Sequence, residues 1–228
     1  MLPERRERMK HTMKLITEPK KPHLGNGSFM KFESSSMPIT KPNRRLSFDT
    51  VLKELQKSHF GVLSTVTKDG RSHSAGVFYS LSPSARPLEI YVMTRTKLKK
   101  ARNIMNNSNV SFVVPLRRRF LTFVSSPCIE FQGHAEIIDW KDEIGVAAFK
   151  TSFMGRTIVN AYDDMYRQGD TTICFLRITP DPTIFTYGVG VSVWEMRRHM
   201  ETGSAKVEIP LEYQNLTKVV SEQSKVAS

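Results

Sequence analysis

The sequence predicts a β-barrel or β-sandwich with a few helices on the outside, and three observations lead to this prediction. Six or more short segments are rich in β-branched and aromatic residues, and several of them alternate apolar with polar side chains. The pair Asp69-Gly70 stands between two such segments and is a strong signal for a tight hairpin turn. The segments do not alternate regularly with helices, which argues against a doubly wound parallel sheet.

Composition divides the chain into three parts. Its 228 residues are 39% hydrophobic and 25% charged, which is ordinary for a globular protein, and the formal net charge is +12. Residues 1–45 hold 11 Lys and Arg against 4 Asp and Glu, which accounts for +7 of that charge, and they include five prolines. We therefore expect a disordered basic arm at 1–45, a folded domain at 46–200 and a polar, loose tail at 201–228.

The elements of the expected domain can be justified in order. A helix is predicted within 46–61, because Ser47 is a good N-cap, four apolar residues from Phe48 to Leu55 share one face, and Gly61 can end it. Gly133 is expected to mark a bulge or a close approach of two backbones. The remaining elements are expected as a hairpin over 60–82, a turn at 82–87, a strand at 88–94, a helix at about 97–107, a strand at 109–116, a charged loop at 117–119, a strand at 128–139, two helical stretches within 140–168, a strand at 171–179 continued over 181–188, and a last strand at 191–199.

The stretch MTRTKLKKARNI (93–104) carries five cations around the start of a predicted helix, where the helix dipole favours acids instead. Two interpretations remain open from the residues alone. The lysines are simply solvated, or an anion such as phosphate binds there. The second interpretation requires Thr94 or Thr96 at the N-cap, with free backbone N–H groups beside it.

Other common functional motifs are absent from the sequence. There is no P-loop, no HExxH, and the GVG at 188–190 lacks the rest of a dinucleotide fingerprint. The six histidines are scattered, and the two cysteines, Cys128 and Cys174, do not have the spacing of a metal site. No apolar run of about 18 residues predicts a membrane span. The N-terminus is charged and lacks an apolar signal core, so we expect a cytoplasmic protein without a bound metal.

Four stretches follow one another in an order that a known family shares. They are the hairpin GVLSTVTKDGRSHSAGVFY, the strand and basic helix LEIYVMTRTKLKKARNIMNNSNVSF with its K-x-x-N-I core, the G-x-A strand IEFQGHAEIIDWKDE, and the closing CFLRITPDPTIFTYG. Over about residues 46–190 this order resembles the pyridoxamine 5'-phosphate oxidase-like family of FMN-binding split barrels. Each stretch alone is only weakly specific for the family, and the resemblance gains its specificity from the order of all four.

The resemblance implies a six-stranded Greek-key split β-barrel with a few peripheral α-helices, a homodimer, and FMN at the dimer interface. It further implies an oxidoreductase acting on a small molecule, and it assigns no acid or base side chain. Lys100, which opens the K-x-x-N motif, is the strongest single candidate. By position, the resemblance assigns Ser74, Ala75, Gly76 and Val77 to the isoalloxazine ring, Thr94 and Arg95 to the ribityl–phosphate side, Lys99 and Lys100 to the phosphate, and Cys128 and Tyr187 to the surroundings of the flavin.

Two departures from the family pattern argue against vitamin oxidase activity. The segment VGVSVWEMRRHM lacks the arginine-rich pattern that holds the substrate phosphate, and Ala75 stands where those enzymes have an arginine. Other members of the superfamily use FMN, a deazaflavin or haem. Two alternatives therefore stay open: a flavin- or haem-binding protein without turnover, and a nucleic-acid or anion-binding module that uses the basic arm. Against nucleic acid, the predicted strands show no exposed aromatics interleaved with basic residues.

Overall fold

The computed structural model describes residues 46–116, 126–198 and 203–215. The chain divides into two units, Met1–Thr40 and Lys41–Ser228, and every described residue belongs to the second. The predicted basic arm and the charged loop at 117–119 lie outside the described residues.

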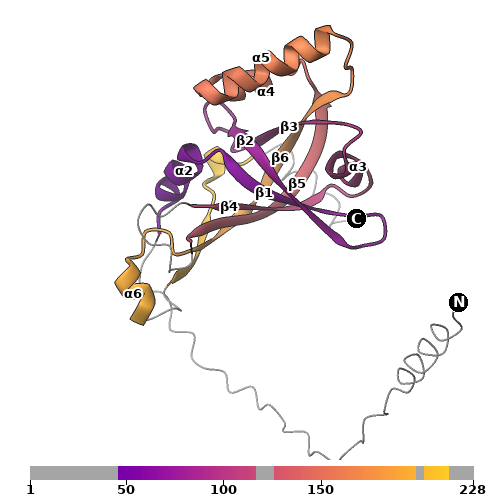
Figure 1. Cartoon of the computed structure of the whole chain (residues 1–228). Helices are drawn as coiled ribbons and strands as arrows, with labels where there is room; N and C mark the ends of the chain where they lie inside the picture. The colour runs from indigo at the N-terminus through magenta and orange to yellow at the C-terminus, as the bar shows by residue number, and fades with distance from the viewer. Residues whose placement is uncertain (1–45, 117–125, 199–202, 216–228) are drawn as a thin grey trace, which may run out of the picture. The chain divides into compact units, whose positions relative to one another are not determined.

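A closed barrel of six antiparallel strands forms the body of this unit (Figure 1). The strands follow the order β3-β2-β1-β4-β5-β6, and β6 pairs back onto β3 to close the barrel. Strands β2 and β3 pair only where Tyr79–Leu81 meets Ile90–Val92, so the barrel is open between them beyond that point. The predicted split barrel is thereby confirmed. The strands are β1 (Phe60–Val66), β2 (Ser72–Leu81), β3 (Ile90–Arg95), β4 (Asn109–Pro115), β5 (Cys128–Asp139) and β6 (Ile173–Tyr187).

The barrel interior is an apolar core, and the strands alternate between core and surface with the period of two that a strand imposes. In β4, for example, Val110, Phe112 and Val114 are buried while the residues between them are half-buried. The rings of Phe112 and Phe131 stack with centroids 5.4 Å apart. Gly133 marks a register shift between β5 and β6, and a Cβ there would lie 2.3 Å from the Thr179 carbonyl oxygen, as expected of a close backbone approach.

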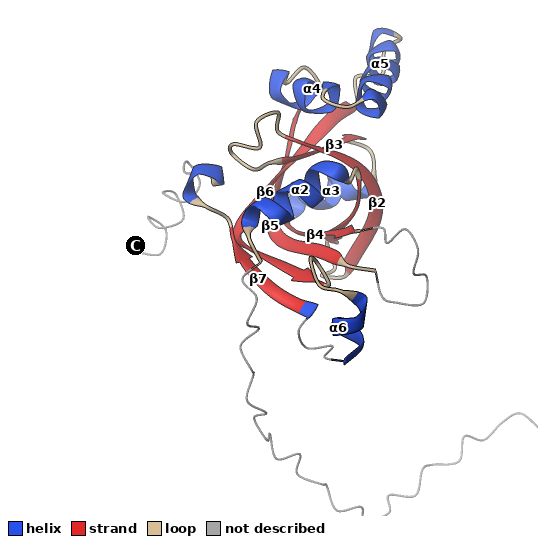
Figure 2. Cartoon of the chain, turned by 90° about the vertical axis from the view of Figure 1, so that its left-hand side faces the viewer, coloured by secondary structure: helices blue, strands red, loops and turns tan. Residues whose placement is uncertain are grey.

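Helices α2 (Phe48–Lys57) and α3 (Lys99–Asn106) pack their apolar faces against the barrel core (Figure 2). Ser47 caps α2 as predicted, since its side chain accepts from the Thr50 N–H. Each helix is also tied to a strand by one hydrogen bond. Tyr79 Oη donates to the Leu55 carbonyl of α2 at 2.8 Å, and Asn103 Nδ2 of α3 donates to Thr65 Oγ1 at 2.9 Å.

Helices α4 (Glu143–Lys150) and α5 (Phe153–Arg167) lie over the outer surface of β3 and β6 (Figure 1). A second apolar cluster forms there around Tyr91, Trp140, Phe149 and Phe175. None of the described helices has both the length and the apolar character needed to cross a membrane.

The structure corrects the sequence prediction in the last third of the chain. The expected strand at 191–199 is a short helix, α6 (Val193–Arg198), because Ser192 caps it by accepting from the Glu195 N–H. The expected loose tail contains strand β7 (Ser204–Glu208), which pairs with β6 outside the barrel, and a 3-10 turn, Leu211–Tyr213. The two expected pieces 171–179 and 181–188 form the single strand β6, which continues through two prolines.

Candidate functional site

The basic segment enters helix α3 later than the sequence suggests. Helix α3 begins at Lys99, and its N-cap is Leu98, which offers no side-chain hydrogen bond. The expectation that Thr94 or Thr96 caps the helix is wrong, because both extend the β3–β6 ladder: Thr94 pairs with Cys174, and the Thr96 N–H donates to the Thr172 carbonyl. Among the described residues, the backbone N–H groups of 99–101 have no acceptor.

Lys100 lies half-buried in the first turn of α3. Burial lowers the pKa of its ammonium, and a negative charge on the nearby Cys174 thiol would raise that pKa. Burial also raises the pKa of the Cys174 thiol to about 11, so the thiol offers no negative charge at neutral pH. No ion pair or hydrogen bond of Lys100 Nζ is found within the described part of the chain. The structure thus holds a half-buried cation without a counter-ion.

Thr94 lies beside the same cysteine, as its direct partner across the β3–β6 ladder. Its side chain is 1% exposed, and Oγ1 has no hydrogen-bond partner in the described residues. Thr94 and Lys100, which the sequence assigned to the cofactor, therefore lie in the same region around Cys174, and both have unsatisfied polar groups.

Arg95 is already paired within the chain. Its Nε donates to Asp170 at 2.7 Å, and the guanidinium lies 5.4 Å from the centre of the Tyr162 ring. Hydrogen bonds from Thr172 and then from Arg95 hold the pKa of Asp170 at about 2. Arg95 is therefore held by Asp170, in the loop between α5 and β6, and by the Tyr162 ring of α5. Asp170 was missed by the sequence analysis, since nothing local links it to a residue so far away in the chain.

Lys97, Lys99 and Arg102 are exposed. Lys99 lies near the β1–β2 turn, where the pKa of Asp69 is lowered by the hydrogen bond from Thr67 and more weakly by the charge of Lys99. The five cations of the segment therefore have three environments: three are in solvent, Arg95 is in an ion pair, and Lys100 is half-buried and unpaired. Only the last environment is costly without an anion.

The four candidate residues on β2 divide between the two faces of the strand. Ser74 and Gly76 are exposed on the outer surface, where the Ser74 hydroxyl shares a hydrogen bond of 2.8 Å with Ser64. Val77 belongs to the barrel core, and Ala75 shares its face. A ring lying on the outer surface would therefore meet Ser74 and Gly76 directly and the other two only through their backbone. A Cβ at position 76 would lie 2.9 Å from the Phe60 ring.

Cys128 and Tyr187 form a second group, as direct partners of the β5–β6 ladder. Burial raises the pKa of the Cys128 thiol. The register Ser74–Ser64–Ser111–Gln132 runs from β2 across β1 and β4 to β5, and Cys128 lies four residues before Gln132. With about 4.8 Å between strands and about 3.4 Å per residue, Ser74 and Cys128 are on the order of 20 Å apart measured along the sheet. The two groups therefore lie at different places on the outer surface of one protomer.

The outer surface between these two groups is a sheet face that no described helix covers. It mixes apolar and polar side chains of intermediate or high exposure. The residues of this uncovered face are Val62, Ser64, Ser111, Val113, Cys128, Glu130, Gln132, Phe185 and Tyr187.

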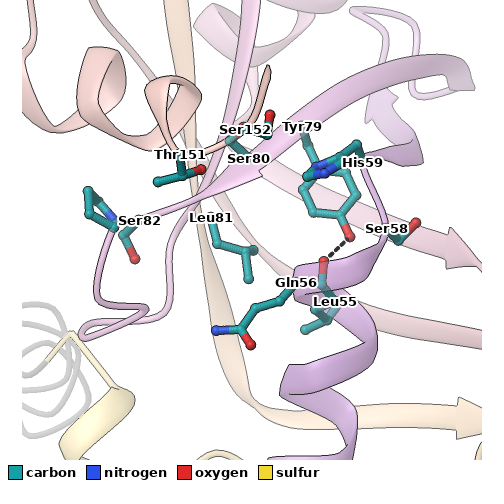
Figure 3. A pocket seen from close by; sticks show the side chains of 11 residues that line it. Leu55, Gln56, Ser58, His59, Tyr79, Ser80, Leu81, Ser82, Thr151 and Ser152 are labelled. Carbon is teal, nitrogen blue, oxygen red and sulfur yellow. Dashed lines mark hydrogen bonds between the residues drawn. The ribbon is translucent and has the colours of Figure 1, made fainter. Parts of the chain in front are cut away.

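A cavity of about 280 Å³ lies elsewhere on β2, beyond the candidate ring residues (Figure 3). It is bounded by the end of α2, by the last residues of β2 and by the connection between α4 and α5. The sequence analysis did not find it, because its walls come from three segments that no motif links. Within the described residues, no group of three or more His, Cys, Asp or Glu side chains could hold a metal ion.

Comparison with known sequences gives one family. The profile described as pyridoxamine 5'-phosphate oxidase matches residues 48–186, which is more than half of the chain. A search of curated proteins gave no match.

Two solved structures share the fold at low sequence identity, and a third gives a weaker match. The heme storage protein HutZ from Vibrio cholerae has a TM-score of 0.50 and 18% identity, covering 64% of this chain and 98% of its own. A heme-binding protein from Mycobacterium smegmatis has a TM-score of 0.52 and 13% identity, covering 72% of this chain and 59% of its own. An FAD-binding protein from Mesorhizobium loti has a TM-score of 0.43 and 20% identity, covering 62% of this chain and 94% of its own.

Proposed function

Because the chain belongs to the pyridoxamine 5'-phosphate oxidase family, we propose that it binds FMN at a homodimer interface and oxidises or reduces a small molecule. When bound, the flavin supplies the hydride chemistry, and the protein supplies position and electrostatics. The substrate and the electron donor are left open, and no side chain is assigned as acid or base.

The observation that carries the proposal is the unpaired, half-buried ammonium of Lys100. Taking a cation out of water is costly unless a negative charge compensates it. The phosphate of FMN would supply that charge. The unsatisfied N–H groups of 99–101 would donate to the same phosphate from the helix start. Thr94 is the ladder partner of Cys174, a residue close enough to Lys100 for their charges to interact, and its buried hydroxyl has no hydrogen-bond partner among the described residues.

The flavin ring would then lie along the outer surface of β2. Ser74 and Gly76 are small and exposed there, so a flat ring can approach the backbone closely. Ala75 and Val77 would face it only through their peptide groups. The side of the ring toward Phe60 would also be apolar, since that side chain is 52% exposed beside Gly76.

The separation of the two candidate groups along the sheet supports the homodimer in this proposal. Cys128 and Tyr187 are on the order of 20 Å from Ser74 within one protomer, by the strand spacing used above. A second copy, docked on the uncovered face, would place its own Cys128 and Tyr187 next to the first copy's flavin. The flavin would be covered from both sides, as a ligand of its size requires.

The substitution Lys100→Ala tests the phosphate assignment. Removing one charge-assisted contact should cost roughly 1.5–3 kcal/mol, or about one to two decades in FMN affinity. Riboflavin lacks the phosphate, so its affinity should hardly change. Both affinities can be measured by fluorescence titration of the purified protein.

The matched control is Lys97→Ala, because Lys97 is exposed on the same segment and should affect neither ligand. Equal losses for FMN and riboflavin in Lys100→Ala would mean that this lysine acts on the fold or on the ring. The phosphate assignment would then fall.

Haem is the alternative cofactor, since two solved structures with this fold are described as haem proteins. A haem iron needs an axial side chain, most often histidine. Among the described residues His73 is half-buried on β2 and its Nδ1 is buried without a partner, which leaves that nitrogen out of reach of a surface ligand. The visible spectrum of the purified protein decides: flavin bands favour FMN, and a sharp Soret band favours haem.

A further inference from the structure

The cavity at the end of β2 has walls from three parts of the fold (Figure 3). Contacts between the walls and within them hold the walls in place before any ligand arrives. Tyr79 Oη donates to the Leu55 carbonyl, the His59 ring stacks on Phe78 with centroids 5.4 Å apart, and Ser152 caps α5 by accepting from the Gly155 N–H. A preformed cavity binds a ligand without the entropic cost of ordering its own walls.

The lining of this cavity is mostly polar and includes one imidazole, that of His59. None of the described residues that line it is Asp, Glu, Lys or Arg. The carboxamide of Gln56 and the imidazole of His59 have no hydrogen-bond partner among the described residues, so both remain available to a ligand. The lining residues are Leu55, Gln56, Ser58, His59, Tyr79, Ser80, Leu81, Ser82, Pro83, Thr151 and Ser152.

The hydroxyls of the lining complement these two groups. Thr151 donates to the Ala148 carbonyl and Ser152 accepts from Gly155, so the first keeps a free acceptor and the second a free donor. Such a set can pair with groups that both donate and accept, as alcohols do. A charged ligand would lose its hydration and find no opposite charge in return.

The volume limits the size of the ligand. At about 30 Å³ for each water molecule, 280 Å³ corresponds to about nine waters, or about as many non-hydrogen atoms. We propose that this cavity binds a small, neutral, hydroxyl-bearing molecule of about the size of a pentose. The proposal concerns binding alone and does not depend on the flavin.

Saturation-transfer NMR on the full-length protein tests the proposal, with ribitol and D-ribose as probes and ribose 5-phosphate as the charged comparison. The neutral probes should receive saturation from the protein, and ribose 5-phosphate should receive much less. Gln56→Ala should weaken ribitol binding about three- to tenfold, the effect of one neutral hydrogen bond.

A variant that blocks the cavity distinguishes binding in this cavity from binding elsewhere on the protein surface. Gln56→Trp would fill the cavity from an exposed position on α2, so folding is not at risk, and it should abolish transfer to both neutral probes. Lys53→Trp is the matched control, because Lys53 is exposed on the same helix but does not line the cavity. The proposal is overturned if neither neutral probe receives saturation, if Gln56→Trp binds them as the wild type does, or if ribose 5-phosphate binds equally well.

Discussion

Ser80 and Ser82 lie two residues apart at the end of β2, and their hydroxyls have different environments. Ser82 Oγ donates to the Pro87 carbonyl at 2.6 Å, whereas Ser80 Oγ is buried and has no hydrogen-bond partner among the described residues. A buried polar group without a partner costs free energy, while a satisfied one contributes a modest net gain.

We expect Ser80→Ala to raise the free energy of unfolding by about 1 kcal/mol and Ser82→Ala to lower it by about the same amount. The first substitution removes an unpaired hydroxyl, and the second breaks a hydrogen bond. Urea unfolding of the two variants and the wild type measures the difference. If Ser80→Ala is destabilising to the same degree as Ser82→Ala, its hydroxyl has a partner in solution.

The ion pair of Arg95 with Asp170 gives a pH dependence. Hydrogen bonds from Thr172 and Arg95 lower the pKa of Asp170 from 3.8 to about 2, so the folded state favours the ionised carboxyl. The stability that the ionised Asp170 contributes is fully present above the pKa of this carboxyl in the unfolded chain, and it is lost as pH falls toward 2. The difference in Tm between wild type and Asp170→Asn should therefore be constant above about pH 5 and shrink below about pH 4. A difference that stays constant down to pH 3 would contradict this.

At the scale of elements, strand β7 shows that the chain beyond residue 200 contributes to the core. Val207 is buried opposite Ile184, and Ile209 is 2% exposed, with its N–H donating to the Pro182 carbonyl. The sheet is thereby extended past the boundary at 200 that composition suggested.

We expect Ile209→Ala to lower the free energy of unfolding by about 2–4 kcal/mol, through lost burial and the cavity left behind. Leu211→Ala, two residues on, is the matched control, because Leu211 is 69% exposed and should have almost no effect. Chemical denaturation of both variants makes the comparison. Equal effects would mean that this segment does not pack in solution as it does in the structure.

At the scale of the whole molecule, we expect residues 1–40 to be dispensable for folding and for dimerisation. Their sequence is basic, includes four of the chain's twelve prolines and has no periodic apolar pattern, a composition that predicts little contribution to a folded core. A protein without these residues should sediment as a dimer with the same stability as the full chain. Aggregation or a monomer would place the arm in the folded body, and a monomer that still binds flavin tightly would overturn the interface proposal.

The strands and their hairpin were predictable from the sequence, because the period-two alternation of a strand and a hairpin turn are local signals. These signals left a barrel or a sandwich open, and the family resemblance implied the barrel. The Asp69-Gly70 hairpin, the cap at Ser47 and the bulge at Gly133 all appear where their residue types place them. The family was recognisable for a related reason, since the order of elements is itself a property of the sequence.

The environments of the candidate site residues were decided only by the tertiary structure. Five cations on one short segment have the same charge in the sequence, yet the fold pairs Arg95 with a carboxylate 75 residues away and half-buries Lys100 near Cys174. The strand at 204–208 and the cavity at the end of β2 likewise depend on segments that meet only after folding. The physical reason is common to all of them. The free energies of burial and pairing depend on neighbours in space, whereas sequence patterns reveal only neighbours along the chain.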